Sequence, residues 1–191
     1  VVDEGTELTI SCAAGAGYRF GSLKVNNNDF VSGSTHVASD VVNVLAIFIP
    51  VYNVSISSNT GNFVYIFNES TPVLNGESVD GGTELAITAT AGDGYRLVSL
   101  KVNGEDFTSG SSLTIDKNLT VQAVFIRVFD VLISSGSGGS IKVLDNDTDV
   151  LSGSDVDKGG ILTISATAQS GYRLFSLKVN DVDFVNEGQL V

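Results

Sequence analysis

The chain has 191 residues, of which 42% are hydrophobic, so it can form one domain or two to three small ones. It carries 22 acidic and 10 basic residues, which gives a net charge of −12. Because nucleic acids and anionic membranes bind clustered Lys and Arg, this charge balance argues against both as partners. A single cysteine excludes an intrachain disulfide, and no apolar run reaches the ~18 residues that predict a membrane span.

A long internal repeat organises the sequence. Gly17-Tyr18-Arg19 recurs as Gly94-Tyr95-Arg96 and as Gly171-Tyr172-Arg173. The tyrosines stand at positions 18, 95 and 172, so the period is 77 residues. Fixed-period self-similarity is typical of proteins built from stacked structural units, and it therefore decides the expected architecture.

The repeat predicts three consecutive modules. Residues 1–50 form an incomplete first copy that lacks the front of the unit, and residues 51–127 form a complete copy. Residues 128–191 form a third copy that lacks its last strand. We expect the chain to be a segment excised from a longer array. The alternative is that its two incomplete ends complement each other between chains by strand donation.

The first strand of the complete copy follows the alternating pattern of Tyr52, Val54 and Ile56, and turn residues across 57–62 end it. The alternation resumes at Val64 and Ile66, a further alternating strand follows the polar loop 68–82, and a last one spans 119–126. Since no segment has helical periodicity, we predict an all-β fold of small antiparallel modules in an extended tandem array. The predicted core of the repeat consists of Leu85, Ile87, Ala89, Tyr95, Leu97, Leu100, Val102, Phe107, Val121 and Phe125.

A change of parity in the strand after Gly94 predicts a β-bulge. Tyr95 and Leu97 share one parity, whereas Leu100 and Val102 have the other. A bulge would bring all four side chains to one face. We expect one near residues 98–99, and near 21–22 and 175–176 in the other copies.

Three motifs of the complete copy resemble a known family. They are Gly82-Thr83-Glu84-Leu85 at the start of a strand, Gly94-Tyr95-Arg96-Leu97 after a turn, and the closing Val121-Gln122-Ala123-Val124-Phe125. Together they resemble the divergent internalin B-repeat, also called the Listeria–Bacteroides-type repeat. The resemblance implies a non-catalytic module of a bacterial surface or secreted protein, and therefore an extracellular or cell-surface location.

Two reactive side chains have structural interpretations. Cys12 corresponds to Ala89 and Ala166 in the other copies, so we interpret it as a small packing residue. His36 is the only histidine and corresponds to Leu113, which favours a half-buried edge residue over a metal ligand or a catalytic base. The sequence accordingly predicts no catalytic residues, no cofactor and no enzyme activity.

One acidic run is a candidate calcium site. Asp145, Asp147 and Asp149 alternate as in a calcium-binding loop, but Val150 stands where an EF-hand has glycine, and no bidentate Glu follows. A solvated acidic turn is the favoured interpretation, with no metal ligand.

Six basic side chains recur at the same positions of the repeat, and two interpretations are open. They could form a periodic ligand-binding stripe, or their aliphatic portions could cover the sheet while their charged groups pair with carboxylates. We favour the second. The recurring tyrosines are interpreted as core residues rather than a sugar-stacking platform. The basic residues are Arg19, Arg96, Arg173, Lys24, Lys101 and Lys178, and the tyrosines are Tyr18, Tyr95 and Tyr172.

The leading functional prediction is a stalk or spacer whose partners are the neighbouring repeats of the same chain. One alternative is an adhesin that binds a host glycan or protein through the loops 68–82 and 104–112, with Phe63, Tyr65 and Phe175 as the candidate ligand surface. Another is a subunit of an extracellular filament or virion appendage, in which copies of the chain bind one another by strand complementation.

Overall fold

The computed structural model describes residues 1–59 and 63–190, and the predicted turn across 57–62 and the end of the third copy lie partly outside this range. The described residues are all-β and contain no helix, as the alternation predicts. The chain divides into two compact units. The first consists of residues 1–58, 64–89 and 99–123, and the second of residues 59–63, 90–98 and 124–191.

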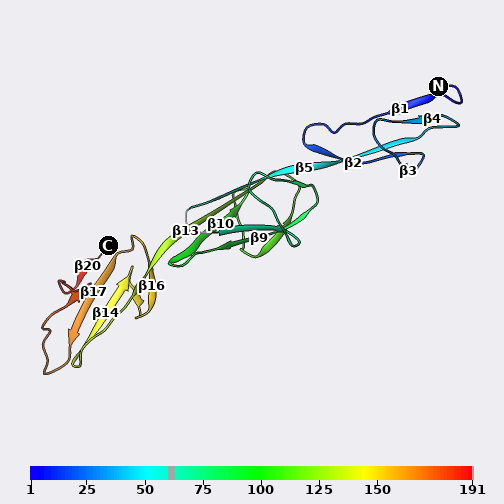
Figure 1. Cartoon of the computed structure of the whole chain (residues 1–191). Helices are drawn as coiled ribbons and strands as arrows, with labels where there is room; N and C mark the ends of the chain where they lie inside the picture. Colours follow the sequence, from blue (N-terminus) through cyan, green and yellow to red (C-terminus); the bar gives the residue numbers. More distant parts are fainter. Residues whose placement is uncertain (60–62, 191) are drawn as a thin grey trace. The chain divides into compact units, whose positions relative to one another are not determined.

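The strands follow one another along the chain with short turns (Figure 1). Their bounds are β1 Glu7–Ile10, β2 Tyr18–Val25, β3 Asn28–Asp29, β4 Ser34–Val37, β5 Val44–Ser58, β6 Phe63–Asn68, β7 Thr71–Pro72, β8 Ser78–Asp80, β9 Glu84–Thr90, β10 Tyr95–Val102, β11 Glu105–Asp106, β12 Ser111–Thr114, β13 Leu119–Val131, β14 Gly139–Asp145, β15 Thr148–Val150, β16 Ser154–Asp157, β17 Leu162–Ala168, β18 Lys178–Val179, β19 Val182–Asp183 and β20 Gly188–Leu190.

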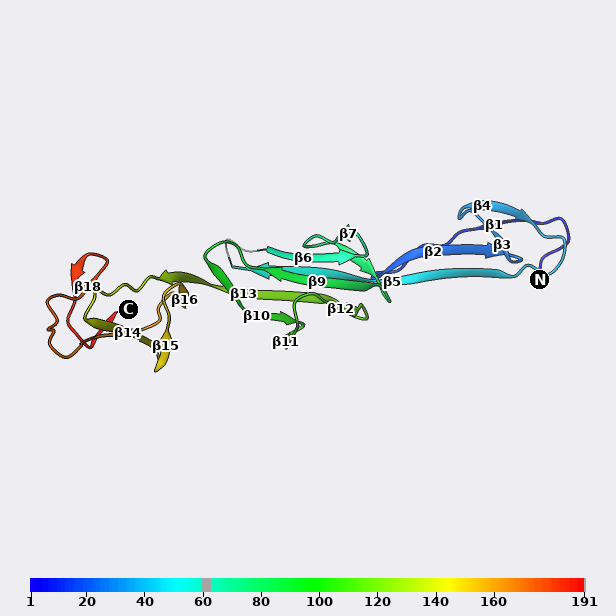
Figure 2. The same ribbon diagram turned by 90° about the horizontal axis from the view of Figure 1, so that it is seen from below.

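The long strand β5 organises the main sheet of the first unit, whose order is β11-β10-β13-β5-β2-β3. Its first part, Val44–Pro50, runs antiparallel to β2, beside which it lies in Figures 1 and 2. Its middle pairs with β8, and its last part, Val54–Ser58, pairs with Leu119–Ala123 of β13.

The pairing of β5 with β13 is parallel, which is an exception to the antiparallel pairing predicted for the modules. A hairpin turn can join antiparallel neighbours, whereas parallel neighbours need a long connection. Here the connection from residue 58 to residue 119 contains β6 to β12, so the two strands enter the sheet in the same direction.

A second sheet of the first unit has the order β12-β9-β6-β7, and the sheet β1-β4 belongs to the same unit. The core of the first unit is densely packed, and Leu85, Ile87 and Val121 are fully buried in it. Of the other residues predicted for the repeat core, Leu100, Val102 and Phe125 are buried, whereas Ala89, Tyr95, Leu97 and Phe107 are half-buried.

The predicted bulge is present in β2, where the register with β5 shifts between Phe20 and Ser22. A Cβ on the intervening Gly21 would lie 3.0 Å from the carbonyl oxygen of Ile47, so glycine allows the close approach. The prediction is wrong for the third copy, because residues 172–177 belong to no strand. Their counterparts in β10 pair with β13.

The second unit contains the sheet β15-β14-β17-β20, the pair β18-β19, and β16 paired with Val128–Val131 of β13. Its buried core consists of Val143, Leu162, Ile164 and Leu177. The strands β14 and β17 share a seven-residue antiparallel register from Gly139 opposite Ala168 to Asp145 opposite Leu162. Their alternating apolar residues therefore share one face.

The interpretation of all three recurring tyrosines as core residues is wrong for two of them. Tyr95 is half-buried, but Tyr18 and Tyr172 are 52% and 61% exposed. Tyr172 lies in the segment that forms no strand, so no sheet holds its ring inward.

Candidate functional site

Two arginine–aspartate pairs join residues of consecutive copies. In the first unit, Arg19 Nε donates to Asp80 Oδ1 at 2.5 Å, and Nη2 donates to the second carboxylate oxygen. In the second unit, Arg96 Nε donates to Asp157 Oδ1 at 2.6 Å, and its Nη2 contacts the other oxygen. Both pairs have the bidentate geometry in which guanidinium and carboxylate match best.

The electrostatics of these pairs follow from their hydrogen bonds. The guanidinium donors lower the pKa of Asp80 and of Asp157, and the carboxylates raise the pKa of Arg19 and of Arg96. The arginine side chains are about half exposed (49% and 51%), so solvent and salt screen the attraction. We therefore treat the pairs as fixing orientation more than as a large source of stability.

Backbone hydrogen bonds repeat beside the two ion pairs. Val51 N donates to Gly17 O at 2.9 Å, and Val128 N donates to Gly94 O at 2.8 Å. In the same way, the carbonyls of residues 50 and 127 accept hydrogen bonds from the amides of residues 81 and 158, at 2.7 and 2.8 Å. The two bonds of the second unit repeat the two bonds of the first with an offset of 77 residues, so the same small set of contacts occurs in each unit.

The recurring basic side chains face carboxylates in most cases. Besides the two arginine pairs, each recurring lysine lies near an aspartate five residues later on the neighbouring short strand, at 3.0, 3.1 and 3.9 Å. Arg173 forms no ion pair within the part of the chain that the structure describes. The lysine pairs are Lys24–Asp29, Lys101–Asp106 and Lys178–Asp183.

The aromatic side chains predicted as a ligand surface are exposed. Tyr65 is 44% exposed and stacks on Phe67 of the same strand, with ring centroids 6.3 Å apart. Phe63, at the start of β6, is 54% exposed. Phe175 is 90% exposed and lies in the second unit, in the segment without strand structure.

The predicted contact loops are partly structural. In the loop 68–82, Val73 is buried, and Asn75 Oδ1 accepts a hydrogen bond from Ile56 N at 2.7 Å. The loop 104–112 includes β11, and Gly110 N donates to Ile87 O at 2.8 Å. Both loops therefore hold the module together as well as exposing polar residues.

The acidic run 145–149 forms the hairpin between β14 and β15, with positive φ at Asn146 and Asp147. Asp149 pairs with Lys142 at 3.1 Å. In residues 1–59 and 63–190, no group of three or more His, Cys, Asp or Glu side chains is placed to hold a metal ion.

Cys12 and His36 both lie at the edge of the first unit. Cys12 is half-buried, and its amide donates to Ser32 Oγ at 2.9 Å. The amide of its counterpart Ala89 likewise donates to Ser109 Oγ, also at 2.9 Å, which is consistent with a packing role. His36 is half-buried in β4 and contacts the ring of Phe30 edge-on, with centroids 6.2 Å apart.

Sequence reasoning did not predict the polar residues that pair with the recurring arginines or that hydrogen-bond the backbone of a neighbouring strand. Asp80 and Asp157 stand 77 residues apart and each complete a bidentate pair, and this recurrence was the available signal. Asn26 and Asn103 were missed in the same way. Each has positive φ, at 50° and 51°, and clamps the backbone of the neighbouring strand.

Comparison with known families identifies the central part of the chain. Residues 52–128 match the family model of the divergent InlB B-repeat domain, so this segment is a member of that family, and the resemblance inferred from its motifs is confirmed. No curated protein and no solved structure matches the chain. Among the described residues, no helix is long and apolar enough to cross a membrane.

Proposed function

We propose that this chain is a structural segment of a bacterial surface or secreted protein, in which consecutive 77-residue modules act as a stalk or spacer. The family of residues 52–128 supports a surface repeat domain. The observation that carries the proposal is the recurrence of one junction, with the same bidentate pair and the same backbone bonds, in both units.

A repeated junction is what a spacer requires. Each module supplies its own core, and contacts between sequence neighbours set how one module follows the next. The net charge of −12 keeps the surface soluble and opposes edge-to-edge association of the exposed strands. No catalytic constellation is part of this role, and the function lies in the reach that the array provides.

Small-angle X-ray scattering tests the extended arrangement. A single compact body of this length has a radius of gyration of roughly 16 Å, whereas a linear array of modules gives on the order of 25 Å. The Arg19→Ala/Arg96→Ala double variant removes both bidentate pairs and should broaden the distance distribution. Arg173→Ala is the matched control and should leave the scattering unchanged. A compact radius for the unmodified chain would contradict the spacer role.

A second candidate function is glycan or protein adhesion, favoured by the exposed Tyr65, which stacks on the half-buried Phe67 of the same strand, β6. Aromatic faces of this kind stack on sugars and anchor protein interfaces. A glycan array probed with the chain and with Tyr65→Ser tests it, with Phe129→Ser as a control at an exposed aromatic residue outside the candidate ligand surface. Loss of binding in Tyr65→Ser alone supports adhesion, and absence of any binding rejects it.

A further inference from the structure

The strand that begins the complete copy and the strand that ends it are neighbours in one sheet. Val54–Ser58 of β5 runs parallel to Leu119–Ala123 of β13, with Val54 opposite Leu119 and Ser58 opposite Ala123. The two strands lie beside each other in Figures 1 and 2. These two five-residue segments are called the central strand pair below.

Both strands extend beyond the central strand pair without a break. β5 is one strand from residue 44 to residue 58, and its part Val44–Pro50 pairs with β2 of the first copy. β13 is one strand from residue 119 to residue 131, and its part Val128–Val131 pairs with β16 of the third copy. A pull on the chain from either side of the complete copy therefore reaches the central strand pair along extended backbone.

The parallel direction decides how such a pull acts. The load enters β5 at Val54 and leaves β13 at Ala123, and these residues lie at opposite ends of the pair. Tension draws β5 toward its N-terminus and β13 toward its C-terminus, so the strands are sheared lengthwise past each other. All five residue pairs are then loaded together, whereas a pull on one end would open them one after another. Resistance to force depends on the barrier to unfolding, and simultaneous rupture raises that barrier.

The backbone groups of the pair are committed on both sides. Val54 N and O bond residues 77 and 76, both at 2.8 Å, on the far edge of β5. Because successive residues of a strand alternate, Ser55 and Ser57 direct their backbone groups toward β13. Thr120 of β13 bonds the turn that follows β10, through both N and O at 2.8 Å. Each strand is thus held to the rest of the copy as well as to its partner.

Asparagine side chains close the two ends of the pair. At one end, Asn53 N donates to Asn118 Oδ1 at 3.0 Å. At the other, Asn59 follows β5 directly and bonds the backbone of Phe125 twice: Nδ2 donates to Phe125 O at 2.6 Å, and Oδ1 accepts from Phe125 N at 2.9 Å. The amide of Asn59 offers the same donor and acceptor as a peptide group, so it adds one further set of bonds after the strand has ended.

The inward side chains of the pair also oppose sliding. Val54 and Leu119 are 1% exposed, Val121 is 0% exposed and Ala123 is 3% exposed. A shift of one residue along the strand would turn these side chains to the solvent face. Shear therefore has to disrupt the apolar core at the same time as the backbone hydrogen bonds.

We propose that the central strand pair bears tension, so that the complete copy resists unfolding when the chain is stretched between its neighbours. The proposal deepens the spacer function and rests on it for the source of the tension, because a spacer between two attached bodies is the part that is stretched. The strength itself follows from the parallel pairing, the asparagine bonds at both ends and the buried inward side chains.

Single-molecule force spectroscopy in two pulling directions tests the proposal on the 191-residue chain. Handles at the two termini shear the pair. A handle at the N-terminus and another at the exposed position of Lys117→Cys load both strands at the same end and peel them apart. Cys12→Ala in both samples leaves one attachment thiol and introduces the residue that the other copies have. Unfolding of the complete copy is recognised by the release of roughly 20 nm of chain.

At equal loading rate, the unfolding force of the complete copy should be at least twofold higher for shear than for peeling. The same protein is pulled in both samples, so a difference reports the direction of the load. Equal forces in the two directions would overturn the proposal. An extended scattering radius with equal forces would overturn this proposal alone, whereas a compact radius with unequal forces would reject the spacer function and support the strength of the pair.

Asn59→Ala provides a test at a single side chain. It removes both bonds to Phe125 and should lower the shear force, while the peeling force stays unchanged because peeling begins at the Asn53 end. Asn68→Ala is the matched control, since it alters an exposed asparagine of the same copy outside the two strands, and it should change neither force. An unchanged shear force in Asn59→Ala, or an equal loss in both directions, would contradict the proposal.

Discussion

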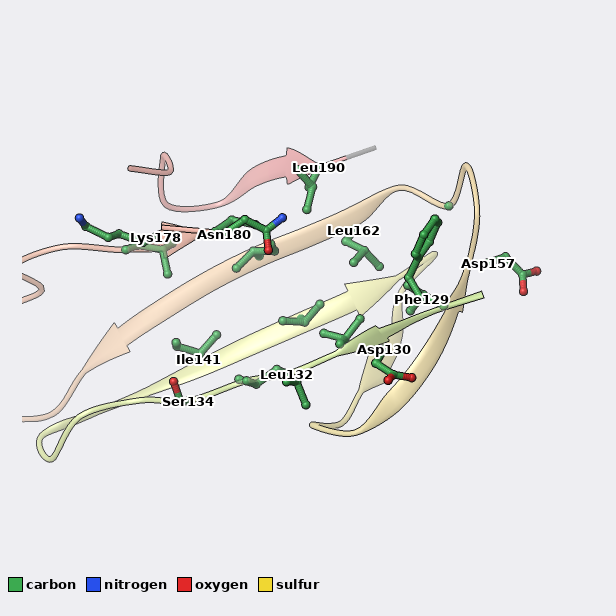
Figure 3. Close-up of a pocket in the computed structure, with 18 of the residues that line it drawn as sticks. Phe129, Asp130, Leu132, Ser134, Ile141, Asp157, Leu162, Lys178, Asn180 and Leu190 are labelled. Atoms are coloured by element: carbon green, nitrogen blue, oxygen red, sulfur yellow. The ribbon is translucent and has the colours of Figure 1, made fainter. Parts of the chain in front are cut away.

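Alanine replacement of Leu85 and of its counterpart Leu162 tests whether the two units enclose their cores to different degrees. Leu85 lies in β9 with 0% of its surface exposed. Leu162 occupies the equivalent position in β17, but it is 8% exposed and lines a groove of about 760 Å³ in the second unit (Figure 3). The two residues are chemically identical, so a difference in stability reports their surroundings.

The two substitutions should differ in cost. Leu85→Ala leaves an enclosed cavity, so the lost transfer free energy and the cavity both count, and the first unit should lose about 3–4 kcal/mol. In Leu162→Ala the freed space joins the groove and water reaches it. The cost should then approach the transfer contribution of the deleted carbons, about 2 kcal/mol.

Native-state hydrogen exchange, read by mass spectrometry on peptides from β9 and from β17, measures the opening free energy of each unit separately. Leu74→Ala, at a residue that is 61% exposed, is the control and should change stability by less than about 0.5 kcal/mol. A loss in Leu162→Ala equal to or larger than that in Leu85→Ala would refute the reasoning that the second core is open.

Three further predictions concern the second unit. A hydrogen bond from Arg96 lowers the pKa of Asp157 below its ordinary value of 3.8. The stabilisation of the folded state by this pair is complete above pH 3.8 and is lost as the pH falls through the lowered pKa. Acid titrations of the Asp157→Asn variant should lack this loss of stability. The hydrogen bond that protonated Asp155 donates to the carboxyl group of Asp130, opposite it on β13, raises the pKa of Asp155. This contribution to stability is present below pH 3.8 and is lost as the pH rises through the raised pKa. Asp155→Asn should therefore resist denaturant better than the unmodified chain at pH 7 but not at pH 3. Gly138→Ala should lower the free energy of unfolding, measured by thermal unfolding, by about 1–3 kcal/mol. The φ angle of Gly138 is +102°, and the added Cβ would overlap the ring of Tyr172. Gly136→Ala is the control, because its Cβ would meet no neighbouring atom and the substitution should be tolerated.

The alternation of apolar residues was sufficient to predict the longer strands of the central copy, whereas the short strands β7, β8, β11 and β12 were not predicted. Leu85, Ile87 and Val121 share the inward parity of their strands, and all three are fully buried. The parity switch correctly indicated the bulge at Gly21 in β2. Such features depend on a residue and its near neighbours in sequence, which is why a single sequence reveals them.

The third copy shows where local patterns stop being informative. Residues 172–177 carry nearly the same motif as 95–100, and yet they form no strand. A strand is stable when a neighbour satisfies its backbone groups, and this neighbour comes from a distant part of the chain. The motif therefore predicts a capacity to form a strand, and the pairing partner determines whether the strand forms.

The same distinction explains the parallel pairing of β5 with β13 and the two bidentate ion pairs. Alternation assigns a side chain to a face of a strand, but it does not name the neighbouring strand or its direction. Arg19 and Asp80 are 61 residues apart, and nothing in the local sequence of either one indicates the other. What does indicate them is recurrence, because Arg96 and Asp157 repeat the spacing of 61. In a repetitive chain, polar positions that keep their mutual spacing from copy to copy are thus the best sequence evidence for long-range contacts, as the apolar alternation is for strands.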